Sequence, residues 1–387
     1  RLTYGYNGNM DQQTTAFATA RYFSANINGQ RYASLQSPPN PDLRWEKTAM
    51  WNGSVGFSLF ANRISGNIEY YERKGDGLIG YAPLEPTTGI DRFRGNVANM
   101  ESSGLDVLLE TKNVNSSGFA WHTSFNGSFV SDRVTEYKLP TAATNYLFVD
   151  ASLTGSQAEL SPTVGRPLFG VYSYPWAGLS PETGNPRGYL NGEVSDEYSR
   201  IISAANSYDS LVYHGRATPS FFGSLMNTFT YRRVSLSINL TYKFGYSFRR
   251  ASLNYNTLFS AYNGHADFAN RWQQPGDERH TDVPAMRYPV NSSRETFYSR
   301  SSVLVERGDH IRLQDVRLSY ALPVPVASKL GLQRMELYFY AANLAILWRA
   351  NDTGLDPDYG AVRLTGSRGL VLPAPPTYAL GIDIHLN

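Results

Sequence analysis

The chain has 387 residues with a formal net charge of +2, no cysteine, 18% charged residues and 13% aromatic residues. Charged residues are scarcer than in an ordinary soluble domain, and the absence of a Lys/Arg block argues against nucleic acid as a partner. Without cysteine the chain has neither disulfides nor thiolate metal sites. The apolar runs are only a few residues long, so a membrane location would require a closed β-barrel rather than transmembrane helices.

Alternating apolar and polar residues predict about eleven strands along the chain. These are residues 2–6, 15–22, 51–59, 64–70, 100–110, 120–130, 221–231, 234–244, 311–322, 335–341 and 378–386. We expect the first two to be joined through a Gly-Asn turn region, and the next two to form a short-turned hairpin. A phase slip at Gln314–Asp315 predicts a β-bulge. No segment has a convincing helical pattern, which argues against a parallel βαβ sheet.

The stretch from Val234 to Phe244 shows the two-faced pattern most clearly, with six apolar residues alternating with five polar ones. A soluble β-sandwich alternates in the same way and is the more common class. Three observations favour a membrane barrel: charges avoid the apolar phase, short and long connections alternate, and aromatic residues extend that phase as an interfacial girdle would. The aromatic residues of this predicted girdle are Tyr242, Phe244, Tyr246 and Phe248.

Motifs for catalysis, metals and nucleotides find little support. The GxGxxG match at Gly75–Gly80 is followed by Tyr81-Ala82-Pro83 instead of a helix, so it lacks the context of a phosphate site. Asp352, Asp356 and Asp358 miss the EF-hand spacing, which favours a solvated loop turn over a calcium loop. The six histidines form no HExxH motif, and there is no GxSxG. We therefore predict no enzyme activity, no metal and no cofactor.

A recognition surface is the remaining possibility. Aromatic residues lie in the long loops with Asp, Asn and Arg nearby, a mixture that suits sugars or peptides. The predicted ligand-binding residues are Trp176, Tyr189, Trp272 and Tyr288. The alternative is that these aromatic residues pack the loops together. Polar-phase strand residues are predicted to contact the barrel wall or a plug, and these are Asn239, Lys243, Asp383 and His385.

Residues 40–46 (NPDLRWE) resemble the NPxLKxE signature of TonB-dependent outer-membrane transporter barrels, most closely the SusC/RagA family of Bacteroidetes. Further stretches resemble the same family in the same order along the chain. They are residues 2–9, 60–66 with 69–71, 96–100 with Gly104, 174–184, 308–316 and 354–358. One departure is the final Leu386-Asn387, where such barrels commonly end in an aromatic residue.

The resemblance implies an all-β fold: a transmembrane antiparallel β-barrel segment with long extracellular loops, about half of a barrel of 22 strands. Residues 1–387 would be the C-terminal part of the barrel, with the N-terminal plug, the TonB box and the first strands absent from this chain. The implied location is the outer membrane of a Gram-negative bacterium.

The implied function is TonB-dependent import of oligomeric nutrients, with glycan oligosaccharides favoured and peptides possible. Implied partners are a SusD-like surface lipoprotein as lid, TonB, the rest of the same barrel, the oligosaccharide or peptide substrate, and lipid and lipopolysaccharide. A surface adhesin or structural β-protein without transport activity is the alternative of another class.

Overall fold

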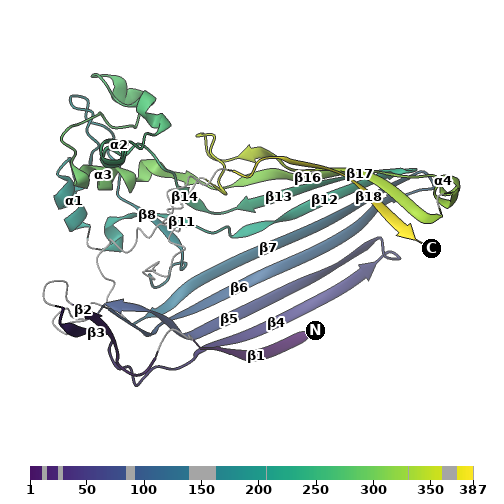
Figure 1. The fold of residues 1–387 in the computed structure, drawn as a ribbon, viewed down its shortest axis with the longest axis horizontal. Coiled ribbons are helices and arrows are strands. Elements are labelled where there is room, and N and C mark those ends of the chain that lie inside the picture. Colours follow the sequence, from purple (N-terminus) through teal and green to yellow (C-terminus); the bar gives the residue numbers. More distant parts are fainter. Residues whose placement is uncertain are drawn as a thin grey trace.

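The computed structural model describes residues 1–10, 15–24, 29–83, 92–138, 163–205, 207–329, 331–359 and 373–386. Ten long strands form one antiparallel sheet in the order β1-β4-β5-β6-β7-β12-β13-β16-β17-β18, as Figure 1 shows. Their bounds are β1 (Leu2–Asn9), β4 (Glu46–Leu59), β5 (Ile64–Pro83), β6 (Arg92–Asn115), β7 (Phe119–Tyr137), β12 (Phe221–Tyr231), β13 (Val234–Phe244), β16 (His310–Ala321), β17 (Leu332–Arg349) and β18 (Thr377–Leu386). The predicted all-β antiparallel fold is confirmed.

Smaller elements lie in the connections. Four two-stranded sheets pair β2 (Thr19–Ser24) with β3 (Arg31–Ser37), β8 (Gly170–Ser173) with β11 (Val212–Arg216), β9 (Gly188–Leu190) with β10 (Glu193–Ser195), and β14 (Ser247–Arg249) with β15 (Val305–Arg307). The helices are α1 (Tyr198–Ala204), α2 (Tyr255–Ala261), α3 (Ser292–Ser299) and α4 (Val324–Lys329), with 3-10 turns at Tyr208–Ser210, Ala266–Asn270, Asp277–Arg279 and Ser302–Leu304. None of the described helices is both long enough and apolar enough to span a bilayer.

Short and long connections alternate along the main sheet, as predicted. Tight turns of residues 60–63, 116–118 and 232–233 join strand pairs at one end, where α4 also lies. The long connections gather at the opposite end, where α1, α2 and α3 form a folded region beyond the strands (Figure 1). One end of the sheet therefore carries short turns, and the other carries long, folded connections.

The predicted bulge in β16 is present. Asn239 of β13 lies opposite Asp315, whereas the next residue, Leu240, lies opposite Leu313. Gln314 is thus the extra residue, and the same irregularity recurs in the pairing with β17. A bulge re-aims the residues on either side of it, which keeps the apolar residues before and after Gln314 on one face.

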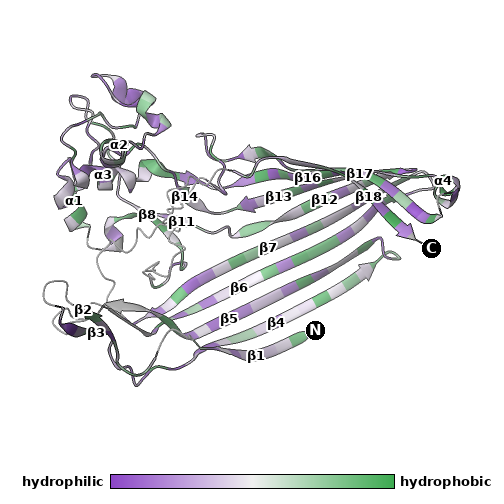
Figure 2. Cartoon of the chain, viewed as in Figure 1, coloured by the Kyte–Doolittle hydropathy of each residue, from purple (hydrophilic) through white to green (hydrophobic). Residues whose placement is uncertain are grey.

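The sheet has one apolar and one polar face. Residues opposite each other in neighbouring strands share a face, and Figure 2 shows the resulting alternation of hydropathy along each strand. Exposed members of the apolar face include Val55, Ile68, Leu105, Phe129, Leu318, Phe339 and Leu380. On β12, β13 and β16, all of which the structure describes, this face carries no charged residue. We call it the apolar face and the opposite one the polar face.

The strand pairing predicted near the N-terminus is wrong. β1 pairs with β4, Tyr4 lying opposite Trp51, so their aromatic side chains fall on the same face. β2 pairs instead with β3, its neighbour in sequence. The reason is that the phase of β1 matches that of a strand far along the chain, which a search for local turns does not reveal.

The aromatic girdle predicted after β13 is also wrong. Gly245 has φ +75° and ends the strand, so the next residues leave the sheet. Tyr246 and Phe248 are both buried, and the Tyr246 ring covers Gly308. Tyr242 is likewise buried, and its hydroxyl donates to the backbone oxygen of Asn126 at 2.9 Å. Burial of these three side chains removes most of the predicted belt.

Candidate functional site

The polar face carries a row of paired charges along β13, β16, β17 and β18. Arg317 lies 2.6 Å from Asp383 and 3.8 Å from Glu336. The amide of Asn239 donates to Asp315 at 2.9 Å. Asn239, which the sequence placed against the barrel wall, therefore contacts the neighbouring strand β16, and Asp383 reaches Arg317 of β16 across β17.

A cluster of charges at the long-loop end fastens residues 351–359 to this face, and we call it the Asp358 latch. The Asp358 carboxylate lies 2.5 Å from Lys243 Nζ, 3.2 Å from Arg312 and 3.5 Å from His310 Nε2. Asp356 forms a second contact with Arg312 at 2.6 Å. The prediction of a solvated loop turn is therefore wrong for Asp356 and Asp358, because strand residues neutralise their charges, whereas Asp352 is exposed in a bend as predicted.

The electrostatics of the latch favour an ionised Asp358. Burial by itself would raise the pKa of this carboxyl, but the contacts with His310 and Lys243 outweigh burial and hold the pKa well below its ordinary range. The His310 ring is almost wholly buried, and its Nδ1 lies 2.9 Å from the backbone oxygen of Gly308. Residues 308–316 and 354–358, two of the segments that resemble the transporter family, thus meet in the latch.

The NPDLRWE segment meets another family-like segment at the same end of the sheet. The backbone N–H of Arg44 donates to Asn96 Oδ1, and Asn96 Nδ2 donates back to Arg44 O, both at 2.9 Å. Glu46 accepts hydrogen bonds from the Ile79 N–H and from Asn9 Nδ2, each at 2.7 Å. This segment therefore joins β1, β5 and β6 where their long connections begin.

Residues 163–216 and 246–307 fold together at the long-loop end into a unit that we call the loop module. Its described part has an aromatic core of Tyr172, Tyr174, Tyr198, Ile201, Ala205, Leu211 and Phe297, and a second cluster of Leu253, Tyr255 and Val283. The two connections are joined by backbone hydrogen bonds between Tyr174 and both Arg300 and Ser302, each 2.9 Å long. Two loops far apart in sequence thus form one packed body.

A buried ion pair stabilises the helical side of the module. Arg294 and Glu295 lie 2.8 Å apart with side chains only 3% exposed. Glu295 also accepts the Tyr255 backbone N–H at 2.8 Å, and Arg294 donates to the backbone oxygen of Ala285 at 2.7 Å. Burial raises the pKa of Glu295 and raises the pKa of Tyr255 to about 12. This pair therefore links α2 and α3 to the segment around Ala285 that lies between them.

Two of the four predicted ligand-binding residues lie inside the module. Trp176 is partly buried and stacks on Phe297 with ring centroids 6.5 Å apart. Trp272 is 8% exposed and donates from its indole nitrogen to Glu278 at 3.3 Å. The Trp272 ring covers Gly184, which has φ +62° and no room for a Cβ. Both tryptophans pack one loop against another, as the alternative reading of these residues proposed.

The other two lie on the surface of the module. Tyr288 is 80% exposed and meets Phe259 edge-on, with ring centroids 5.5 Å apart. Tyr189 is 45% exposed on β9. In the described part of the chain no ring contact joins any two of the four predicted residues. Tyr189 and Tyr288 are therefore the two candidates that a ligand can reach without rearrangement.

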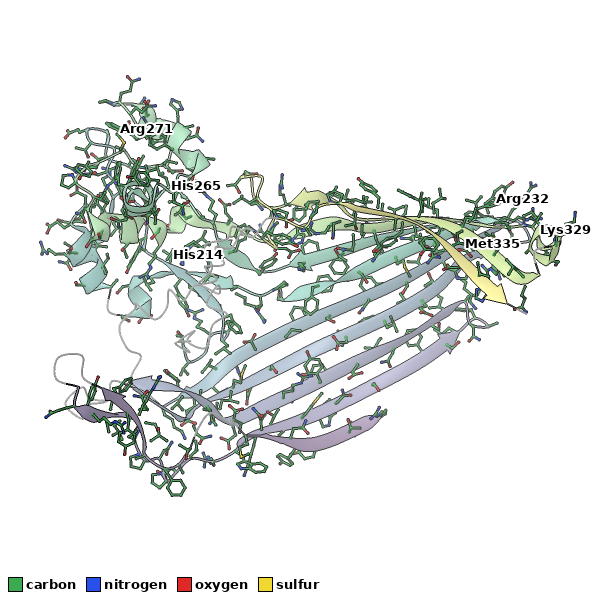
Figure 3. The ribbon with its side chains drawn as sticks, in the orientation of Figure 1. His214, Arg232, His265, Arg271, Lys329 and Met335 are labelled. Carbon is green, nitrogen blue, oxygen red and sulfur yellow. The ribbon has the colours of Figure 1, made fainter. Side chains whose placement is uncertain are left out.

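The sequence reasoning missed a contact between Ser173 and His214, which lies where the module meets the sheet (Figure 3). Ser173 Oγ lies 2.6 Å from His214 Nε2. Burial, and then the nearby Arg249, lower the pKa of His214. Ser173 is completely buried, so the pair fixes β8 against β11 and is closed to a substrate. The two residues are 41 positions apart, and no short motif could have revealed them.

Among the described residues no group of three or more His, Asp or Glu side chains is placed to hold a metal ion. The chemistry available is therefore hydrogen bonding, charge pairing and aromatic stacking. Figure 3 shows His265 and Arg271 on the module, and Arg232, Lys329 and Met335 at the short-turn end. Side chains suited to recognition gather at the long-loop end.

Comparison with known proteins agrees with this geometry. No protein-family model matches the chain. TonB-dependent receptor P3 of Formosa agariphila is 27% identical over 390 residues, which cover 92% of this chain and 35% of that receptor. TonB-dependent receptor SusC of Bacteroides thetaiotaomicron is 29% identical over 111 residues, covering 28% of this chain and 11% of SusC. The chain is similar in sequence to TonB-dependent receptors, SusC among them.

Solved structures show the same fold. The RagAB peptide transporter superposes with a TM-score of 0.70 at 20% identity, covering 99% of this chain and 40% of that one. The RagAB importer in its open-open state gives the same TM-score and covers the whole of this chain. Because this chain spans 35% of receptor P3 and 39% of the related receptor P26, it corresponds to a part of such a receptor. The relatives are receptors or transporters by name.

Proposed function

We propose that the whole protein imports an oligomeric nutrient across the outer membrane of a Gram-negative bacterium in a TonB-dependent manner. The observation that carries this proposal is the ten-stranded sheet, which has one exposed apolar face, uncharged on β12, β13 and β16, and one polar face. An apolar face of this extent is costly in water, whereas in a bilayer it contacts lipid and the polar face lines a lumen.

The two edges of the sheet support a larger barrel. Within the part of the chain that the structure describes, β1 pairs only with β4, and β18 only with β17. Unpaired strand edges are not tolerated in lipid, so we propose that strands upstream of this chain pair with both edges and complete the barrel. The plug and the TonB box belong to that upstream part, and residues 1–387 form the C-terminal part of the barrel.

The long-loop end faces the outside in this proposal, because outer-membrane barrels have short periplasmic turns and long extracellular loops. The loop module then meets a SusD-like lipoprotein that closes over the mouth. Substrate is enclosed between barrel and lid, and TonB pulls on the plug to open a path.

We propose an oligosaccharide rather than a peptide as substrate. The exposed tyrosines of the module, Tyr189 and Tyr288, offer flat apolar surfaces beside hydrogen-bonding groups, which suit sugar rings. Trp176 and Trp272 support the same surface from inside the module by fixing its loops.

The test uses the full-length receptor in energised cells. We expect labelled oligosaccharide uptake that requires TonB, and purification in mild detergent should recover a SusD-like lipoprotein with the barrel. The double variant Y189A/Y288A should reduce uptake with unchanged surface abundance. The matched control is Tyr22→Ala, which removes from β2 a tyrosine that is 78% exposed, close to the 80% of Tyr288. Uptake that is independent of TonB, or a barrel that purifies without any lipoprotein, would contradict the proposal.

A further inference from the structure

The apolar face ends abruptly in a ladder of charges on three adjacent strands. Lys74 of β5, Glu101 of β6 and Arg133 of β7 lie directly opposite one another. Glu101 lies 3.1 Å from Lys74 and 3.0 Å from Arg133. We call these three residues the charged row.

Two further rows lie below it on the same face. The next row consists of Glu72, Ser103 and Ser131, and the carboxylate of Glu72 is turned to the row beyond, where it accepts the Tyr70 hydroxyl. The row after that is apolar and exposed, and consists of Tyr70, Leu105 and Phe129. The same face thus changes from charged to polar to apolar within four residues on each of three strands.

The spacing of these rows matches a membrane interface. Four residues of strand span about 13 Å, which is about 10 Å along the membrane normal for a tilted barrel strand. The headgroup region on one side of a bilayer is about 5 to 8 Å deep, so the charged row reaches its outer limit when the apolar row lies at its inner edge. The apolar row would sit at the ends of the acyl chains nearest the headgroups, and the charged row beside the headgroups.

The charged row also borders a cavity and keeps free donors. A cavity of about 360 Å³ is lined by residues 72–74, 101–103 and 131–133. The side chains of Lys74 and Arg133 are 68% and 66% exposed, although each already contacts Glu101. An ammonium has three N–H donors and a guanidinium five, so both cations keep donors that point away from Glu101. The lining holds two further carboxylates, and each has another partner: Asp132 pairs with Arg216 at 2.5 Å and Glu72 accepts the Tyr70 hydroxyl at 2.8 Å. Lys74 and Arg133 therefore share only Glu101 and can accept a further anion.

We propose that the charged row binds the phosphorylated headgroup of an outer-leaflet glycolipid, whose acyl chains lie on Tyr70, Leu105 and Phe129. This proposal rests on the proposed membrane location of the barrel. A phosphate bridges Lys74 and Arg133, and an acyl chain covers the apolar row directly below. The charged row complements the phosphate of an amphiphile, and the apolar row complements its acyl chain. Free phosphate or a soluble partner would use only one of the two rows.

The experiment measures lipid retention by the purified full-length receptor in native mass spectrometry. The probes are bisphosphorylated lipid A and its dephosphorylated form with the same acyl chains. We expect the receptor to retain the phosphorylated lipid in preference, and K74Q/R133Q to lose that preference. The expected loss is roughly 30-fold, for two cations that each attract an anionic lipid. The charge-conserving K74R/R133K variant should retain the lipid.

Glu101→Gln separates binding from a structural role. Because Glu101 occupies both cations, its neutralisation should strengthen retention of the phosphorylated lipid. Weaker retention in E101Q would show that the row only fastens the strands, and would overturn the proposal. Equal retention of the two lipids by the wild-type receptor would overturn it as well. So would a K74Q/R133Q variant that keeps the wild-type preference for the phosphorylated lipid.

Two controls separate this outcome from failure of the proposed function. Lys329→Gln removes an exposed cation at the short-turn end (Figure 3) and should leave lipid retention unchanged. Oligosaccharide uptake measured in the same variants reports on transport. Normal uptake by K74Q/R133Q together with loss of its preference for the phosphorylated lipid supports the lipid site. If the wild-type receptor shows this preference but imports no oligosaccharide, the proposed substrate is wrong and the lipid site stands.

Discussion

Neutralising Asp358 should release residues 351–359 from the polar face of the sheet. Asn has almost the shape of Asp but lacks the charge that Lys243, His310 and Arg312 share. Arg312 keeps Asp356 as a partner, so the variant weakens the latch without leaving that guanidinium unpaired. The perturbation therefore acts on the attachment of the segment and leaves the strands intact.

The expected magnitude follows from the contacts that are lost. A hydrogen bond to a charged group contributes about 1.5 to 3 kcal/mol. Asp358 is 27% exposed, so solvent screens part of this energy, and we expect the lower value. About 1.5 kcal/mol corresponds to a change of roughly tenfold in the opening equilibrium of the segment.

Hydrogen exchange of the full-length receptor measures that opening. The Tyr359 backbone N–H donates to the oxygen of Asp356 at 3.0 Å, and its protection should fall about tenfold in D358N. Asp383→Asn is the control, because Asp383 pairs with Arg317 on the same face but far from the segment. Unchanged protection in D358N, or an equal loss in D383N, would refute the assignment of the latch.

The stabilisation that the latch provides should depend on pH. The pKa of Asp358 is lower in the folded protein than in the unfolded chain, so the folded state binds fewer protons. The stabilisation is therefore complete above the ordinary carboxyl pKa of about 3.9 and is lost as the pH falls below it. The difference in protection between the wild type and D358N should vanish over the same acidic range.

Three further predictions concern the module and the sheet. Arg294→Met leaves the Glu295 carboxylate buried without its partner and should cost about 3 to 5 kcal/mol, seen as a lower thermal midpoint in tryptophan fluorescence, with recovery in R294M/E295L. Gly223→Ala places a Cβ 1.9 Å from a backbone oxygen of β7 and should abolish the heat-modifiable folded band in gels, whereas Gly5→Ala, with no atom within 4 Å, should preserve it. Burial and a nearby arginine lower the pKa of His214, so the module should lose stability as the pH falls below about 6.5, and His214→Gln should flatten that dependence.

The sequence predicted well those features that depend on local alternation. The strand from Val234 to Phe244 has the predicted bounds, because its period of two is uninterrupted. The bulge at Gln314 was visible as a change of phase between Leu313 and Val316. Strand phase and bulges are written into consecutive residues, so a single sequence suffices to find them.

Features that depend on distant partners were not accessible in this way. The girdle prediction extended the phase of β13 through Gly245, although this residue turns the chain into the module. Trp176 and Trp272 were selected as loop aromatics, but their exposure depends on Phe297 and Gly184 in other segments. Composition identifies an aromatic loop, whereas only the packed structure distinguishes its core from its surface.

The family-like segments acquire a physical meaning from their contacts. Residues 308–316 and 354–358 carry the opposite charges of the latch, and Arg44 and Asn96 bring two further segments together through paired hydrogen bonds. Each pair joins a strand to a long connection at the end where the module lies. If the polar face lines a substrate path, as we propose, these connections must be held at the wall, because a loop free to move would enter the lumen. Four of the segments that resemble the transporter family, residues 40–46, 96–100, 308–316 and 354–358, therefore attach long connections to the sheet.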